Sequence, residues 1–176
     1  MEYRKMKRVL FLDFDGVLNT EKYQATLRLE GKPRWDGFGP LFDPEAINNL
    51  KMILDSVPDV LLVVNSSWKA DGLDRMRTLW ESRELPGKVH SVTPDYVPDL
   101  IHIDLDNPDT ITLLAGKGNE VKEWLSQYAP DGCKYVIIDD MPDFLPEQES
   151  FLICTDPRKG IMYEDAVKAI SLLNPR

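Results

Sequence analysis

The stretch Arg8-Val9-Leu10-Phe11-Leu12-Asp13-Phe14-Asp15-Gly16-Val17 decides the fold of this chain. Its first five residues are mostly apolar and predict a short buried strand. The strand ends in two carboxylates, and a buried carboxylate without a partner or a metal is very costly. Residues two apart on a strand point to the same side, so Asp13 and Asp15 are expected at the carboxyl edge of a sheet, where open α/β sheets bind ligands. Gly16 then allows the backbone to turn sharply.

Apolar runs and helical stripes alternate along the rest of the chain. Further buried strands are predicted at 59–64, 135–138 and 151–154, and helices at 43–57, 73–86, 117–129 and 163–173. Asp43-Pro44-Glu45 indicates a helix start, because a capping acid precedes a proline in the first turn. Strands that alternate with helices predict an α/β fold with a mainly parallel sheet and helices on both faces.

Two segments lack this regularity. Residues 20–42 predict an insertion above the first strand, either a small lid or a surface loop in which Trp35 packs down as an anchor. Residues 87–115 are compatible with short strands at 89–92 and 100–104 and with a second insertion. The whole chain, 1–176, is expected to form one domain.

Composition narrows the function. The chain has 176 residues and a net charge of −9, which argues against a protein that holds long nucleic acid, although one terminal phosphate needs only a local positive site. Cys133 and Cys154 lack the spacing of zinc ligands and suit a reducing compartment. No apolar run approaches the ~20 residues that span a membrane, so a cytoplasmic protein without a membrane partner is expected. The composition does not set the oligomeric state.

Polar groups cluster where predicted strands end. They are Asp13 and Asp15, Ser66, Lys117 before a helix, and Asp139 with Asp140. In a parallel sheet all carboxyl ends lie on one edge, so these residues are expected to share one site. Several carboxylates in a small volume repel one another, and a divalent cation relieves that repulsion. All-oxygen ligands favour a hard ion, so Mg²⁺ is the expected cofactor.

The order of these residues resembles the haloacid dehalogenase-like (HAD) superfamily of phosphohydrolases. Its four motifs are matched by Asp13-Phe14-Asp15-Gly16-Val17, Val63-Val64-Asn65-Ser66, Lys117 and Ile137-Ile138-Asp139-Asp140. The resemblance runs from Val9 to about Cys154 and implies a three-layer, Rossmann-like fold with a small cap insertion.

The chain also resembles a smaller branch of this superfamily, the HAD domains associated with Swiss Army Knife RNA repair proteins. The matching segments are Ser66-Ser67-Trp68, Lys117 to Val121 with Trp124-Leu125, Asp139-Asp140, and Thr155-Asp156-Pro157. That branch usually carries Arg at the position of Lys117 and Thr at the position of Met162. The first difference keeps the positive charge, and the second affects only a helix cap.

The resemblance implies a Mg²⁺-dependent phosphatase that hydrolyses a phosphomonoester through an aspartyl-phosphate. Asp13 would attack phosphorus, and Asp15 would protonate the leaving oxygen and later deprotonate water. Ser66 and the amide of Phe14 would hold the phosphate. Lys117 would neutralise charge on Asp13 and on the phosphate.

The metal would be held by Asp13, the backbone carbonyl of Asp15, and Asp139 and Asp140, with Asp140 favoured as the inner ligand. Chemically simpler alternatives stay open at this point: Ser66 and Ser67 are also suitable helix caps, Ser67 is the rival phosphate contact, and Lys122 is the rival of Lys117.

The substrate class is less determined than the chemistry. The branch favours a nucleotide or a nucleic-acid end, with Trp35 as a substrate contact if the insertion covers the site. A small phosphorylated metabolite, phosphoryl transfer to an acceptor other than water, and a non-catalytic phosphate-binding module are the alternatives. The intact pair Asp13 and Asp15 argues against the last of these.

Overall fold

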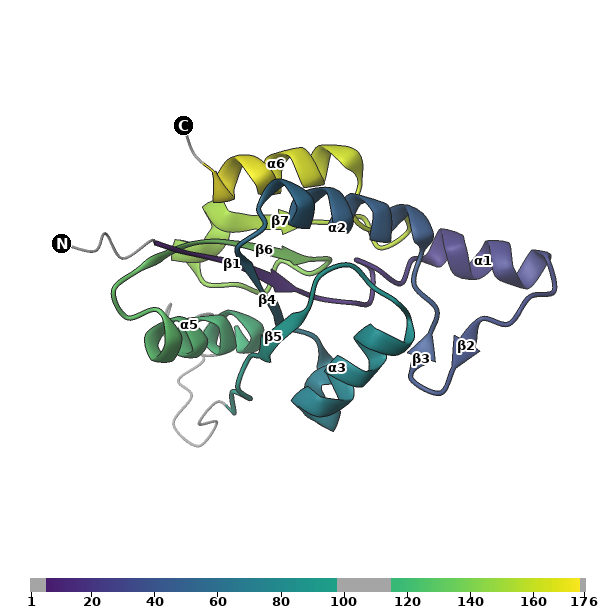
Figure 1. Cartoon of the computed structure of the whole chain (residues 1–176), viewed down its shortest axis with the longest axis horizontal. Coiled ribbons are helices and arrows are strands. Elements are labelled where there is room, and N and C mark those ends of the chain that lie inside the picture. Colours follow the sequence, from purple (N-terminus) through teal and green to yellow (C-terminus); the bar gives the residue numbers. More distant parts are fainter. Residues whose placement is uncertain (1–5, 98–114, 175–176) are drawn as a thin grey trace, which may run out of the picture.

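The computed structural model describes residues 6–97 and 115–174, and the strand predicted at 100–104 lies outside them. A five-stranded parallel sheet forms the centre of the fold (Figure 1). Its strands are β1 (Lys7–Leu12), β4 (Val60–Val64), β5 (Val89–Val92), β6 (Cys133–Asp139) and β7 (Leu152–Cys154). The strands expected from the apolar runs are therefore confirmed, with ends that differ by one or two residues.

The strand order, β5-β4-β1-β6-β7, places β1 in the middle of the sheet. Leu12, the last residue of β1, pairs with Val64 of β4 on one side and with Ile138 of β6 on the other. The chain leaves β1 towards β4 and leaves β6 in the opposite direction, towards β7. The topology thus switches between β1 and β6, and ligands of open α/β sheets bind in the crevice at such a switch point.

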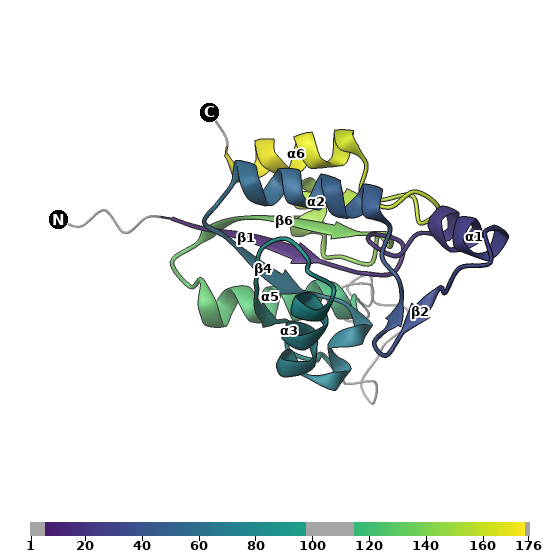
Figure 2. The same ribbon diagram turned by 45° about the vertical axis from the view of Figure 1, so that its right-hand side comes forward.

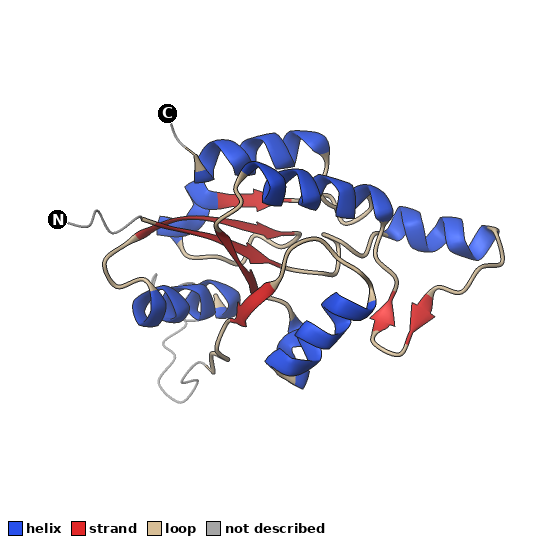
Figure 3. Cartoon of the chain, in the orientation of Figure 1, coloured by secondary structure: helices blue, strands red, loops and turns tan. Residues whose placement is uncertain are grey.

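Helices cover both faces of the sheet, as the alternating pattern predicted. On one face α2 (Pro44–Ser56) and α6 (Tyr163–Leu173) lie side by side, and α5 (Gly116–Tyr128) lies on the opposite face (Figures 1 and 2). Figure 3 shows the same layers, with blue helices on either side of the red strands. The fold is therefore a three-layer α/β fold of the Rossmann-like type.

Side chains of β1 alternate between the two layers of core. Leu10 and Leu12 belong to the apolar cluster under α2 and α6, whereas Val9 and Phe11 belong to the cluster under α5. A third helix, α3 (Leu73–Ser82), packs against β5 at the edge of the sheet. Among the described residues, no helix combines the length and the apolar character needed to cross a membrane. Both cysteines are free thiols.

Residues 20–42 form a helix and a hairpin that protrude from the sheet (Figures 1 and 2). The helix is α1 (Glu21–Leu29), and the hairpin joins β2 (Trp35–Asp36) to β3 (Gly39–Pro40). The sequence pattern did not indicate α1, because this helix buries only Leu27 and so needs no apolar stripe. Its first turn is instead stabilised by Thr20, whose hydroxyl accepts a hydrogen bond from the amide of Tyr23.

The two ends of the insertion contact each other. Thr20 caps α1 and Asp43 caps α2, and the Thr20 hydroxyl donates a buried hydrogen bond of 2.7 Å to the Asp43 carboxylate. The predicted helix start at Asp43-Pro44-Glu45 is thereby confirmed, because the Asp43 side chain accepts from the amide of Glu45.

Two arginines fasten the hairpin to α3. Arg83 donates hydrogen bonds of 2.9 and 2.7 Å to the two carboxylate oxygens of Asp36, and it donates a third, of 3.1 Å, to the carbonyl of Gly39. Arg75 donates to the carbonyl of Gly37. Trp35, in contrast, is 61% exposed, so the alternative in which this tryptophan packs down as an anchor is wrong.

Candidate active site

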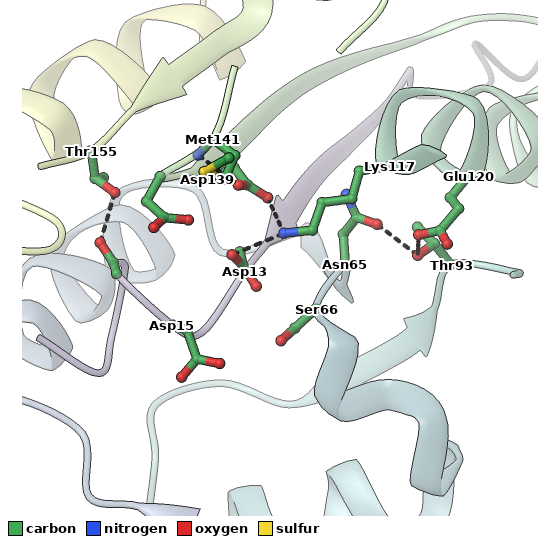
Figure 4. A network of polar contacts seen from close by, with 12 residues as sticks. Asp13, Asp15, Asn65, Ser66, Thr93, Lys117, Glu120, Asp139, Met141 and Thr155 are labelled. Carbon is green, nitrogen blue, oxygen red and sulfur yellow. Dashed lines mark hydrogen bonds and ion pairs between the residues drawn. The ribbon is translucent and has the colours of Figure 1, made fainter. Parts of the chain in front are cut away.

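The backbone hydrogen bonds of the sheet continue for one residue beyond several strands. They hold the backbone of the polar residues that follow those strands. The amide of Asp13 donates to the carbonyl of Ile138, and the amide of Asn65 donates to the carbonyl of Leu12. The amide of Thr93, after β5, likewise donates to the carbonyl of Val64. Because the five strands of the central sheet are parallel, these residues lie together at one edge of that sheet (Figure 4).

Lys117 bridges two carboxylates at this edge. Its Nζ lies 2.9 Å from Oδ2 of Asp13 and 2.6 Å from Oδ2 of Asp139, which ends β6 (Figure 4). Lys117 lies in the first turn of α5 rather than before that helix. Its sequence rival, Lys122, is an exposed residue whose ammonium lies 3.9 Å from Glu147. The structure thus brings Lys117, and not Lys122, to the strand ends.

Asp139 and Asp140 occupy different environments. Both carboxylate oxygens of Asp139 already accept hydrogen bonds, one from Lys117 and one from the amide of Met141. The Asp140 carboxylate packs instead over Gly16, where a Cβ atom would lie 2.4 Å from Oδ2 of Asp140. Asp140 is therefore freer to bind a cation than Asp139.

Burial and charge raise the pKa values of the two bridged carboxyl groups. Burial raises the pKa of Asp13, and the neighbouring ammonium of Lys117 opposes this shift. Burial, followed by the charge of Asp13, raises the pKa of Asp139 to about 7. Burial alone would lower the pKa of Lys117, but the charges of Asp13 and Asp139 outweigh it and the pKa is raised. The site therefore holds more negative charge than Lys117 neutralises.

The residues present fit a hard divalent cation. Asp13, Asp139 and Asp140 each offer a carboxylate oxygen, and these oxygens all lie within 4.8 Å of one another. Three carboxylates against one ammonium leave two negative charges when all are ionised. Carboxylate oxygens are the ligands that Mg²⁺ prefers, so the charge and the donor type both match this ion.

Comparison with models of known protein families shows which family the chain belongs to. The model described as "HAD domain in Swiss Army Knife RNA repair proteins" matches residues 9–166. The chain belongs to this family. The resemblance inferred from the sequence motifs is thereby confirmed, and membership indicates a hydrolase of the phosphatase type. Neither a curated protein nor a solved structure matches the chain.

The side chain of Ser66 contacts both a helix start and the Asp13 carboxylate. Its side chain accepts a hydrogen bond of 3.4 Å from the amide of Trp68, which caps the short 3₁₀ helix η1 (Ser67–Asp71). The Ser66 hydroxyl and the amide of Phe14 also hydrogen-bond the Asp13 carboxylate, and these contacts oppose the rise that burial causes in the pKa of Asp13. The helix-capping and site-facing interpretations of Ser66 are thus compatible. Ser67, the rival residue, is exposed.

Asp15 lies apart from the three clustered carboxylates. Its exposed side chain accepts hydrogen bonds of 2.9 Å from Asn19 and from Trp68. A cavity of about 340 Å³ opens beside it, and Asp15 and Asp140 both line this cavity together with Gln24 of α1. The side chain of Phe14, between the two aspartates, is fully buried, so only its backbone faces the site.

A buried polar network that the sequence analysis missed lies behind Lys117. Lys69 of η1 is 2.9 Å from Glu120, and it donates hydrogen bonds to the carbonyl and the hydroxyl of Thr93. The Thr93 hydroxyl donates in turn to Asn65 at 2.8 Å. Glu120 and Lys69 lie far apart in the sequence, so no local spacing predicts this ion pair. The network ties η1 and α5 to the end of β5.

The loop after β7 supports the turn that contains Gly16. The Thr155 hydroxyl donates a buried hydrogen bond of 2.8 Å to the carbonyl of Gly16 (Figure 4). The amide of Thr155 donates to the carbonyl of Asp139, so this one threonine connects the turn after β1 to the end of β6.

Replacing Gly16 with alanine is expected to weaken Mg²⁺ binding about tenfold to a hundredfold, the usual range for displaced supporting contacts. The added Cβ would collide with the Asp140 carboxylate, and the φ angle of +73° adds backbone strain. Calorimetric titration with Mg²⁺ measures the loss. Gly31→Ala is the matched control, because its φ is +65° and no atom lies within 4 Å of its Cβ position. Equal Mg²⁺ affinity in both variants would contradict the expectation.

Without metal, the stability of the HAD domain is expected to fall as the pH rises from about 4 through 7. The folded state raises the pKa of Asp139 from 3.8 to about 7, so the stability linked to this group is present below pH 4 and is lost as it ionises. Urea unfolding in chelator should show wild type losing stability relative to Asp139→Asn over this range. Saturating Mg²⁺ should remove the pH dependence of wild type. A difference that is flat, or that favours wild type at high pH, would refute this linkage.

Proposed function

We propose that the protein is a Mg²⁺-dependent phosphatase that hydrolyses a phosphomonoester through an aspartyl-phosphate at Asp13. The observation that carries the proposal is the contact of Lys117 with Asp13 at 2.9 Å, at a strand end where two further carboxylates lie within ligand distance. This arrangement holds a carboxylate nucleophile beside a positive charge and beside a site for a divalent cation.

In the proposed reaction, a carboxylate oxygen of Asp13 forms a bond to phosphorus while the bond from phosphorus to the leaving oxygen breaks. Asp15 donates a proton to that leaving oxygen. Asp15 then takes a proton from water, the water oxygen bonds to phosphorus, and the bond to Asp13 breaks to release phosphate. Lys117 offsets the negative charge of Asp13 and of the phosphoryl group, and Ser66 with the Phe14 amide binds phosphoryl oxygens.

Asp13, Asp140 and the backbone carbonyl of Asp15 would hold Mg²⁺, and Asp139 would support the site through Lys117 and water. The preference for Asp140 as the inner ligand rests on the two hydrogen bonds that already occupy Asp139. When bound, Mg²⁺ would supply Lewis acidity and orient the phosphate.

The proposed substrate is a nucleotide or a nucleic-acid end. The family name, with its reference to RNA repair, supports this class. Trp35 is exposed on the hairpin, directly after the exposed residue Arg34. A base stacks well on such an aromatic ring, and the guanidinium of Arg34 suits a phosphate group. The net charge of −9 restricts this contact to a short end rather than a long strand.

A small phosphorylated metabolite is the second candidate substrate. The cavity beside Asp15 and Asp140 measures about 340 Å³, which is at the small end of ligand pockets. A ligand of that size would need no contact with the hairpin.

The test is hydrolysis by the purified protein in Mg²⁺ and in chelator. The substrates are p-nitrophenyl phosphate, a metabolite and nucleotide panel, and oligonucleotides with a 5′ or a 3′ phosphate. Metal-dependent release of phosphate is expected, and no metal-dependent hydrolysis of any substrate would overturn the phosphatase proposal. Trp35→Ala should raise KM for oligonucleotides but not for p-nitrophenyl phosphate, whereas Leu29→Ala, which alters a residue 89% exposed on the same insertion, should change neither. An unchanged KM for oligonucleotides in Trp35→Ala would remove the hairpin from substrate binding.

A further inference from the structure

Trp68 contacts Asp15 directly through its indole nitrogen. Nε1 of Trp68 donates a hydrogen bond of 2.9 Å to Oδ2 of Asp15, while Asn19 donates to Oδ1. An indole N–H can only donate a hydrogen bond, so in this contact the Asp15 carboxylate is always the acceptor. A carboxylate has about four acceptor positions, and these two bonds therefore leave room for the proton and for a leaving oxygen.

Packing fixes the direction of this indole. Its ring lies 5.5 Å from the ring of Phe14 and 5.6 Å from that of Phe42, measured between centroids. The guanidinium of Arg83 lies 5.8 Å from the ring. The backbone of Gly39 covers another part of the indole, since a Cβ at this position would be 2.8 Å from Cη2 of Trp68. The ring is thus enclosed on several sides while its N–H points to Asp15.

Trp68 also connects two elements that lie beside the site, η1 and the hairpin of the insertion. Trp68 is the second residue of η1, and its amide donates to the side chain of Ser66, the cap of that helix. Gly39 belongs to the hairpin of the insertion, which Arg83 fastens to α3. The position of the exposed Asp15 side chain therefore depends on the hairpin and on η1, although neither element carries the carboxylate.

We propose that Trp68 is a positioning residue that holds the Asp15 carboxylate in place for proton transfer to the leaving oxygen and from water. This proposal rests on the proposed function, in which Asp15 is the general acid and base. A free aspartate on the surface samples several rotamers, and a misplacement of about 1 Å lowers a catalytic rate by up to about a hundredfold. The hydrogen bond from Trp68 removes that freedom without occupying all the acceptor positions.

Trp68→Phe tests the role, because it keeps a large aromatic ring and deletes the N–H. Trp80→Phe is the matched control: the Trp80 ring stacks on Phe14 at 6.0 Å, but its N–H donates to the carbonyl of Pro86, away from the site. The readout is the single-turnover rate of alcohol or p-nitrophenol release, which reports the first step, before water attacks the aspartyl-phosphate. The substrates are an alkyl phosphate, whose leaving oxygen needs a proton, and p-nitrophenyl phosphate, whose leaving oxygen does not. Trp68→Phe should slow the alkyl substrate about tenfold to a hundredfold and p-nitrophenyl phosphate much less. Trp80→Phe should leave both rates close to wild type.

Two further measurements separate positioning from structure. In an Asp15→Asn background, Trp68→Phe should have no additional effect on either rate, because the group that it positions is gone. By NMR, the indole N–H resonance of Trp68 should move on Asp15→Asn, while that of Trp80 should not. This second readout needs no activity.

The outcomes distinguish this role from the proposed function. A wild-type protein without any hydrolysis overturns both. With an active wild type, two kinds of result overturn the positioning role. The first is kinetic: Trp68→Phe slows both substrates equally, has the same rates as wild type, or keeps its effect in the Asp15→Asn background. The second is an indole N–H resonance of Trp68 that does not move on Asp15→Asn. Unequal slowing that disappears with Asp15→Asn supports the role.

Discussion

Replacing Asp13 with asparagine is expected to reduce hydrolysis at least about a thousandfold, because an amide cannot form the aspartyl-phosphate. The fold should survive the change. Asp13 is one of three carboxylates whose oxygens lie within 4.8 Å of one another, and its charge contributes to the raised pKa of Asp139. Removing that charge relieves the repulsion while Lys117 keeps its contact with Asp139. The metal-free variant is therefore expected to be at least as stable as wild type at pH 7.

The measurement pairs phosphate release with urea unfolding on the same preparation. Asp143→Asn is the control, since Asp143 is an exposed acid three residues after Asp140 and lies outside the carboxylate cluster. It should keep near wild-type activity. Hydrolysis that survives in Asp13→Asn would rule out the covalent mechanism, and a variant that is both inactive and unfolded would refute the expected stability.

Replacing Lys117 with methionine should produce the second largest loss, about a hundredfold or more in kcat/KM. The variant removes the ammonium that contacts both Asp13 and Asp139. Because this ammonium lowers the pKa values of both carboxyl groups, its loss should raise them further. Both groups then release protons only at higher pH, so the metal-free variant should lose stability more steeply than wild type as the pH rises through 7.

Rate measurements and urea unfolding across pH, with and without Mg²⁺, test this expectation. Lys122→Met is the matched control on the same helix, because Lys122 is exposed and only 3.9 Å from Glu147, a weak surface contact. Lys117→Arg keeps the charge and should retain much more activity than Lys117→Met. Activity of Lys117→Met within a few-fold of wild type would show that the ammonium is not needed for phosphoryl transfer.

Local sequence patterns were sufficient to predict buried strands and helix starts, because apolar runs and capping residues determine these elements. The run Val9 to Leu12 is buried on both faces of the sheet and is predicted as a strand without any knowledge of its partners. Asp43 and Pro44 define the start of α2 by themselves. Since the strands are parallel, their ends had to share an edge, and the convergence of Asp13, Lys117 and Asp139 follows from that geometry.

Other features depend on contacts between distant segments and left little trace in the sequence. The helix α1 buries one side chain, so its pattern resembles that of a loop. Strand alternation did not distinguish Asp139 from Asp140, because the difference arises from Lys117, the amide of Met141 and the close approach to Gly16. The contact of Trp68 with Asp15 joins residues 53 positions apart, and no short-range rule predicts such a pair.

The central place of β1 has a consequence for the synthesis of the protein. β1 gains its first neighbour when β4 emerges, but its other edge stays open until β6 is made, because Lys7 pairs with Cys133. At about 5–20 residues per second, the nascent chain carries this apolar open edge for on the order of ten seconds. An unpaired apolar strand edge is a template for pairing with other chains. The strand that delivers Asp13 is therefore expected to remain open to such pairing until β6 leaves the ribosome.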